Sequence, residues 1–233
     1  GGRLAFTPGG THFVFGRLVQ DGIVARYLDE RCPRPGLRLC EHRAALPNTA
    51  DGWLWGWNSP YYKLGGADGF EPEAQRILAD TLLMYPGLHV VTAVRAGLDQ
   101  LVMVKTGEGI HARDLEHALR ALERYVPAVM PRYYASRQQQ DAFGFAAINA
   151  VQVPLALLAC ALLPLIVLGG SFGRVDRGAA ALALTVLLAL LVNAAICGAF
   201  SNPNDRYQSR VVWLAPFAVL IAALRMRKAP RSG

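Results

Sequence analysis

Acidic side chains are scarce in the C-terminal part of this 233-residue sequence. Residues 143–233 hold only Asp176 and Asp205 against eight Lys and Arg residues, a net charge of +6. Residues 1–142 hold 16 Lys and Arg residues and 15 Asp and Glu residues, a net charge of +1. A protein that binds nucleic acid needs its basic face on the part exposed to water. Here the basic excess lies in the apolar part, so we expect no nucleic-acid partner.

Motifs of catalysis are lacking too. The sequence has no HExxH zinc motif, no nucleophile elbow and no phosphate-binding glycine loop, and its five histidines are scattered. An enzyme normally shows at least one constellation of acid, base or metal ligands. We therefore predict no metal site, no cofactor and no catalytic residue, and whether the chain is an enzyme stays open at this point.

What the C-terminal part does contain is long runs without charge. Residues 143–168 form one such run of 26 residues, and residues 179–200 form a second of 22. A helix needs about 20 predominantly apolar residues to cross the hydrocarbon layer of a membrane. Pro154 and Pro164 are tolerated in such helices because neighbouring groups satisfy the freed backbone. The sequence therefore predicts two membrane-spanning helices.

A third apolar run is shorter, because residues 211–224 supply only 14 apolar positions. A span over about 207–225 requires Arg210 and Arg225 to extend to opposite interfaces. The alternative is a helix that lies flat on the membrane. The predicted fold is thus mainly α: an extracytoplasmic helical domain at residues 1–142, then two to three transmembrane helices within residues 143–233.

Basic residues predict the orientation of these spans. Six of them fall between the first two spans or after the third: Arg174, Arg177, Arg225, Arg227, Lys228 and Arg231. The positive-inside rule places these segments in the cytoplasm. Residues 1–142 and the 201–210 turn then lie in the periplasm, outside a bacterial inner membrane. Export requires a signal peptide or an upstream span, and GGRLAFTPGG is neither, so we expect a longer multi-pass protein of which this is a C-terminal portion.

Residues 1–142 show helical periodicity in four places. The predicted helices cover 11–30, 71–84, 86–104 and 111–126, with Pro72 in the first turn of the second helix. No run alternates in the way that a sheet requires. Residues 32–69 are predicted to be rich in loops.

Cys32 and Cys40 bracket PRPGLRL, whose prolines and glycine favour a tight bend. In an oxidising compartment the pair could close a small disulfide loop, which contributes about 2 to 3 kcal/mol of stability. The alternatives are two free thiols, or a zinc site for which the further ligands are lacking. We favour the disulfide.

Trp53, Trp55 and Trp57 occupy alternate positions, so in an extended segment their indoles would point to one side. They could form a stacking platform for a sugar or lipid headgroup, pack in a core, or form an aromatic belt at the bilayer surface. We favour the last two interpretations and predict aromatic residues at the membrane interface.

Polar residues concentrate at the outer ends of the predicted spans. Asn149 and Gln152 belong to the first span, Asn193 to the second, and SNPNDRYQSR, with Asp205, Arg206 and Arg210, joins the second to the third. Such groups usually face one another, a cavity or a ligand. One hypothesis is a lipid-phosphate site in which the arginines hold the phosphate and Asp205 is a base or metal ligand. The other, which we favour, is structural: Asp205 pairs with an arginine and the amides bridge helices.

Three segments, GRLVQDGIVARYLDERCP, ALPNTADGWLWGWNSP and NPNDRYQSRVVWL, together resemble a group of multi-pass inner-membrane proteins of alphaproteobacteria. In this group a soluble loop precedes the final transmembrane helices. The resemblance implies a periplasmic placement for residues 1–142 and an upstream membrane part. It implies no catalytic residues.

The function that we expect is that of an integral membrane protein with a periplasmic domain, acting as a structural or accessory component. Its partners would be the lipid bilayer and other subunits of a membrane complex. The alternative is the C-terminal part of a multi-pass glycosyltransferase that uses lipid-linked sugars. Part of a transporter ranks last, because only Thr185 is a plausible polar group near the bilayer midplane.

Overall fold

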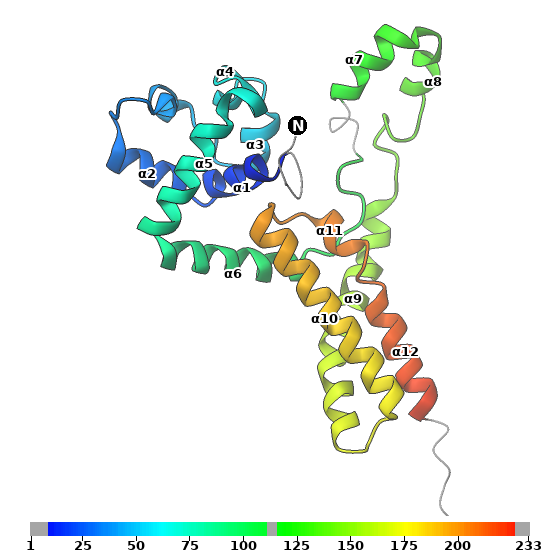
Figure 1. Ribbon diagram of the computed structural model, residues 1–233. Helices are drawn as coiled ribbons and strands as arrows, with labels where there is room; N and C mark the ends of the chain where they lie inside the picture. The colour runs from blue at the N-terminus through cyan, green and yellow to red at the C-terminus, as the bar shows by residue number, and fades with distance from the viewer. Residues whose placement is uncertain (1–8, 111–115, 227–233) are drawn as a thin grey trace, which may run out of the picture. The chain divides into compact units, whose positions relative to one another are not determined.

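The computed structural model describes residues 9–110 and 116–226, which are mainly helical and contain no β-strand (Figure 1). The predicted mainly α fold is therefore confirmed. Contacts divide the chain into two compact units. The first comprises the described residues up to Asp99 together with Ala195–Pro203, and the second comprises Gln100–Ala194 and the residues from Asn204 onward. The boundary predicted at residue 142 separates water from membrane, which this division does not address, so it stays a prediction.

The first unit is a small helical domain built around aromatic side chains. Phe15, Trp53 and Phe70 are fully buried, with ring centroids 5.0 to 5.5 Å apart. The surrounding helices are α1 (Gly10–Gln20), α2 (Ile23–Arg31), η1 (Arg38–Ala45), α3 (Ala50–Trp55), α4 (Pro60–Lys63), α5 (Gly66–Met84) and most of α6 (Pro86–Val102).

Two helix predictions need correction. The single helix expected at 11–30 is broken after Gln20, because Gly22 adopts a left-handed conformation (φ 73°) that begins α2. Helix α5 begins at Gly66, five residues before the predicted start, so Pro72 lies inside it.

The stretch predicted as rich in loops, 32–69, holds three short helices and the start of α5. Thr49 and Ser59 begin two of them, since each side-chain oxygen accepts a backbone N–H of the first turn. The predicted Cys32–Cys40 disulfide is confirmed, with Cα atoms 5.6 Å apart.

The tryptophans do not share one side. Helix α3 replaces the extended segment that their alternate spacing predicted. Trp53 is fully buried in the core, whereas Trp55 and Trp57 are 53% and 57% exposed. Trp53 therefore has the core-packing role, and only Trp55 and Trp57 remain available for a membrane interface.

The second unit contains the apolar helices. The described residues include three segments long and apolar enough to cross a membrane: Phe145–Ser171 (α9), Arg177–Phe200 (α10) and Asp205–Arg225. The third comprises α11 (Asp205–Ser209) and α12 (Leu214–Met226). These match the spans predicted at 143–168, 179–200 and 207–225 within a few residues. The last six residues of α10 belong to the first unit.

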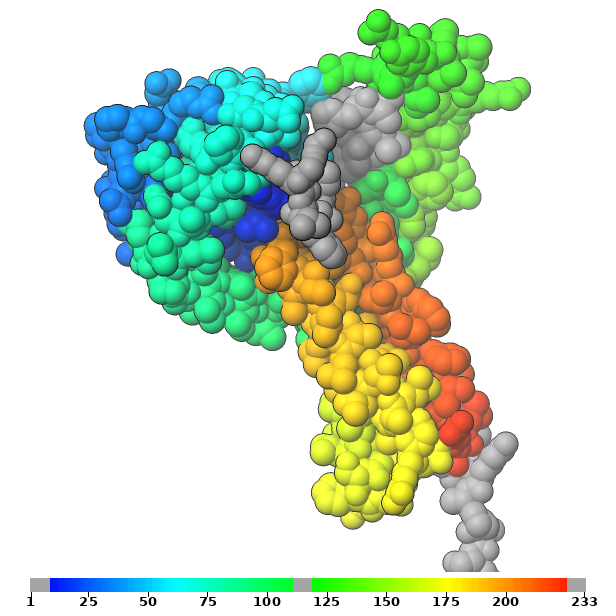
Figure 2. Space-filling view, viewed as in Figure 1, coloured from blue at the N-terminus to red at the C-terminus, as the bar shows by residue number. Residues whose placement is uncertain are grey.

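Small residues line the centre of this bundle. Ala159, Ala183, Ala215 and Ala218 are buried together with Leu163, Val186 and Leu190. Figure 2 shows the side chains of α10 and α12 in contact along the visible face. Small residues permit close packing of transmembrane helices, where lipid removes the hydrophobic driving force between them.

A short helical hairpin precedes the first span. It consists of α7 (Glu116–Tyr125), η3 (Pro127–Val129) and α8 (Met130–Tyr134). Helix α7 matches the prediction at 111–126 except for residues 111–115, which lie outside the described part of the chain.

Candidate functional site

An irregular segment, residues 103–108, follows α6 and lies against the N-terminal end of α9. The side-chain amide of Asn149 accepts the Thr106 N–H (2.8 Å) and donates to the Thr106 carbonyl (2.9 Å). One turn further along, Gln152 Nε2 donates to the Val104 carbonyl (3.0 Å). Val104 is fully buried against Ala156 and Val212. Two amides of the first span thus satisfy backbone groups of this segment.

Helix α11 binds the same segment. Asp205 Oδ1 accepts the N–H of Lys105 (2.8 Å), and Glu108 Oε2 accepts the N–H of Arg206 (2.8 Å). The predicted ion pair between Asp205 and an arginine is therefore replaced by a hydrogen bond to the backbone. The reason is local, because an irregular backbone beside apolar helices needs partners for each of its polar groups.

Gln100, in the last turn of α6, is fully buried and repeats this pattern. Its Oε1 accepts the N–H of Asn204 (2.8 Å) and its Nε2 donates to the Asn204 carbonyl (2.8 Å). A side-chain amide carries one acceptor and two donors, so it can pair with both polar groups of one residue. Gln100 fixes the residue that precedes α11.

A further amide pair joins the second and third spans. Asn193 Nδ2 donates to Gln208 Oε1 (2.7 Å), and Gln208 Nε2 donates to the Leu190 carbonyl (3.3 Å). Gln208 is fully buried. This pair fits the predicted role of amides that bridge helices.

The arginines behave differently from these amides. Arg206 is exposed and its guanidinium lies 5.2 Å from the centroid of the Tyr207 ring. Arg210 is also exposed, and its carbonyl accepts the indole N–H of Trp213 (3.1 Å). The structure thus gathers Asn149, Gln152 and Asp205 around one segment through their side chains, and Arg206 bonds to Glu108 through its backbone N–H.

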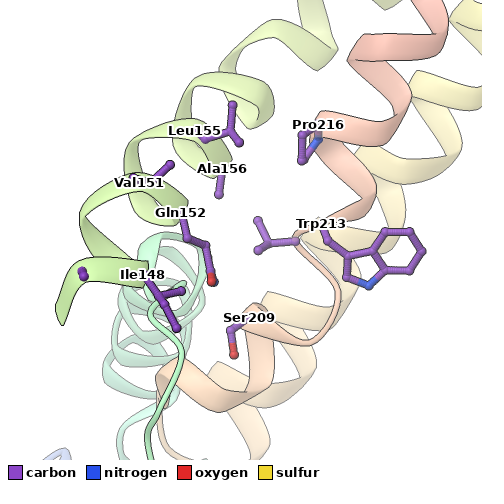
Figure 3. Close-up of a pocket in the computed structure, with 10 residues that line it drawn as sticks. Ile148, Val151, Gln152, Leu155, Ala156, Ser209, Trp213 and Pro216 are labelled. Atoms are coloured by element: carbon purple, nitrogen blue, oxygen red, sulfur yellow. The ribbon is translucent and has the colours of Figure 1, made fainter. Parts of the chain in front are cut away.

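A groove lies beside this network, between α9 and α12 (Figure 3). Its volume is about 630 Å³. Most of its lining is apolar, including Val151, Leu155 and Pro216, while Gln152 and Ser209 add two polar side chains. A groove with this lining could take an apolar chain, such as the acyl or prenyl part of a lipid.

No protein-family model, curated protein or solved structure matches this chain.

Arg17, in the first unit, forms a second polar centre, which the sequence did not reveal. Its guanidinium is buried and donates to Asp21 (2.7 Å), to the Thr92 carbonyl (2.9 Å) and to the Gly198 carbonyl (3.0 Å). Burial lowers the pKa of Arg17. Burial raises the pKa of Asp21, and the charge of Arg17 opposes this rise. With all three nitrogens engaged, Arg17 serves to hold α1, α6 and the end of α10 together.

The sequence patterns did not predict the bridging roles of Gln100, Glu108 and Gln208. The one signal that could have found them is a polar residue isolated at the edge of an apolar helix. Burying such a residue without a hydrogen-bond partner costs free energy, so a partner is expected. The partners themselves are distant in sequence, as Gln100 and Asn204 show. Among the described residues, no group of three His, Cys, Asp or Glu side chains is placed to hold a metal ion.

Proposed function

We propose that the chain is an integral protein of a bacterial inner membrane that acts as a structural or accessory component of a larger membrane complex. In this proposal residues 1–142 lie in the periplasm and the C-terminus lies in the cytoplasm. This placement agrees with the alphaproteobacterial inner-membrane group that the sequence resembles. The bilayer and neighbouring subunits are its partners.

One observation carries the proposal of a non-catalytic role. Three polar side chains at the ends of the spans bond to the protein's own backbone: Asn149 to Thr106, Gln152 to Val104, and Asp205, through Oδ1, to Lys105. A general base or metal ligand must instead have its oxygen directed at a substrate or ion. The carboxylate of Asp205 serves to fix an irregular segment beside the spans.

The placement in the membrane rests on two further features. The six basic residues between or after the spans favour a cytoplasmic position for those segments. The Cys32–Cys40 disulfide favours an oxidising compartment for the first unit. The two features favour the same topology independently.

The test compares Asp205→Asn with Asp205→Ala in protein purified from its native membrane in mild detergent. Asn retains an oxygen that can accept the Lys105 N–H, whereas Ala leaves that N–H without its acceptor. We expect native mass spectrometry to show other subunits bound in fixed stoichiometry to the wild-type protein and to Asp205→Asn, and fewer bound to Asp205→Ala. Purification without any partner protein would refute the accessory role.

A second candidate is the C-terminal part of a glycosyltransferase that uses lipid-linked sugars. The groove between α9 and α12 favours it, because its apolar lining suits a lipid chain and Ser209 in that lining adjoins the exposed Arg210. This candidate predicts transfer of sugar from a lipid-linked donor that Asp205→Asn abolishes while the fold is kept. Unchanged transfer in that variant would leave Asp205 without a catalytic role.

A further inference from the structure

Helix α6 carries an apolar face that stays exposed among the described residues, 9–110 and 116–226. Val90, Val91, Val94, Leu98 and Val102 are between 57% and 65% exposed. With 3.6 residues per turn, these side chains occupy a continuous arc of about 120° on the helix. The charged Arg95 and Asp99 are also exposed, and both lie beyond one edge of this arc.

The opposite face of α6 fixes this orientation. Ala96 is buried, and the Thr92 carbonyl accepts a hydrogen bond from the buried Arg17. A Cβ added to Gly198 would lie 2.5 Å from the Ala96 carbonyl oxygen, so the end of α10 packs directly on the α6 backbone. The helix therefore cannot turn its valines inward without losing these contacts.

A set of five exposed Val and Leu side chains on one helix marks a contact with protein or membrane. The position of the end of α6 favours the membrane. Its last turn contains Gln100, which is bonded to Asn204 at the start of the third span, and the next residues are bonded to the first turns of α9 and α11. This end of α6 is thus tied to the level at which the spans begin.

Helix α6 is not itself a span. Its 17 residues measure about 25 Å, short of the roughly 30 Å hydrocarbon layer, and Arg95 and Asp99 lie within it. Helix α5 cannot extend it, because the two are bent by 102° and α5 packs Phe70 and Ile77 into the core of the first unit. The exposed apolar side chains of α6 share one arc, as in a helix that lies in the plane of the interface.

We propose that α6 is an in-plane membrane helix. Val90, Val94 and Leu98 enter the acyl region of the leaflet at the 201–210 end of the spans, and Arg95 and Asp99 face the headgroups and water. The proposal rests on the membrane placement above but not on the accessory role. Absence of partner subunits would leave it standing.

The test measures nitroxide accessibility along α6 in the full chain reconstituted into lipid nanodiscs. Spin labels are attached at Val94→Cys and Leu98→Cys, with Arg95→Cys and Asp99→Cys as matched controls on the same helix. The two cysteines outside the disulfide, Cys160 and Cys197, are first changed to Ala. Collision with oxygen reports lipid, and collision with a water-soluble nickel chelate reports water.

The expected ratio of oxygen to nickel collisions is several-fold higher at 94 and 98 than at 95 and 99. Equal nickel access at all four positions would show that the face lies in water and would overturn the proposal. Low access of both reagents at 94 and 98 would show a protein covering and would overturn it as well. Each outcome is read from exposed positions whose substitution leaves the packed side of α6 intact.

Discussion

Side-chain amides act as substitutes for backbone in this protein. Asn149 pairs with both polar groups of Thr106, and Gln100 pairs with both polar groups of Asn204. Beside apolar helices, a backbone group that loses its partner finds little water as a replacement, so each lost hydrogen bond costs free energy of folding. The amide suits this role because it donates and accepts within one planar group.

This role predicts a specific weakness at Asn149. Asn149→Asp keeps the acceptor for the Thr106 N–H but loses the donor to the Thr106 carbonyl, which we expect to cost about 1 to 3 kcal/mol of stability. Hydrogen exchange measured by mass spectrometry should rise over residues 103–108. Asn48→Asp is the isosteric control, since Asn48 is exposed. Equal exchange in both variants would contradict the pairing.

A histidine of the first unit predicts a response to pH. Burial lowers the pKa of His89 from its ordinary 6.5, so folding favours the neutral ring. The stability that this contributes is fully present above pH 6.5 and is lost as the pH falls through the lowered value. Asp176 affects stability in a different pH range. The hydrogen bond that Arg225 donates lowers the pKa of Asp176 from 3.8, so its contribution to stability is lost only below pH 3.8.

We therefore expect the melting temperature of the wild-type chain in detergent to fall between about pH 7.5 and about pH 5. His89→Gln should show a smaller fall over the same range, measured by circular dichroism. His42→Gln is the control and should follow the wild type. A slope unchanged in His89→Gln would exclude His89 as the group responsible.

At the scale of elements, the end of α10 is tied to the first unit by close backbone packing. Arg17 binds the Gly198 carbonyl, and the backbone of Ala96 and Gly97 leaves no room for a side chain at residue 198. Gly198 is therefore a packing residue: its missing side chain lets the end of α10 approach the backbone of α6.

The comparison of two helical glycines tests this packing. Gly198→Ala places a Cβ within 2.7 Å of backbone atoms of Ala96 and Gly97, and we expect a loss of about 1 to 3 kcal/mol or a rearranged contact. Gly87→Ala meets nothing within 4 Å and should leave stability unchanged or slightly higher. Chemical denaturation of both variants checks the difference. A neutral Gly198→Ala would show that the two backbones can separate freely.

The elements that could be predicted are those whose signal is local. Residues 145–171 and 177–200 are long apolar runs, and composition alone indicates such helices. The errors arose where a short-range signal competes with periodicity. Gly22 breaks a continuous apolar pattern, and Thr49 starts a helix that overrides the alternation of Trp53, Trp55 and Trp57.

The sequence indicated which residues belong to the candidate site, but not which groups they bind. Asn149, Gln152, Asn193 and Asp205 are unusual beside apolar spans, and that alone indicated that they have partners. Their partners are backbone groups of residues 103–108 and 204–208, many of them distant in sequence. A main-chain partner leaves no mark on residue type, which is why the sequence suggested an arginine for Asp205.

At the scale of the whole molecule, the proposed topology puts the disulfide and the basic residues on opposite sides of the membrane. If residues 1–142 are outside the cytoplasm, Cys32 and Cys40 form their bond in an oxidising compartment, whereas the 172–176 turn lies in the cytoplasm with Arg174. Phe172 is 74% exposed, which makes Phe172→Cys a usable reporter for that turn. The two sides of the membrane can therefore be probed separately.

Thiol labelling of intact cells tests this topology in a background with Cys160→Ala and Cys197→Ala. A membrane-impermeant maleimide should label Cys32 and Cys40 only after an impermeant reductant has opened their disulfide, without any permeabilisation. The same reagent should reach Phe172→Cys only after permeabilisation, because the membrane separates the two sites. Labelling in the reverse order would place the six basic residues outside, against the positive-inside bias. It would also leave a disulfide in a reducing compartment, where such bonds rarely persist.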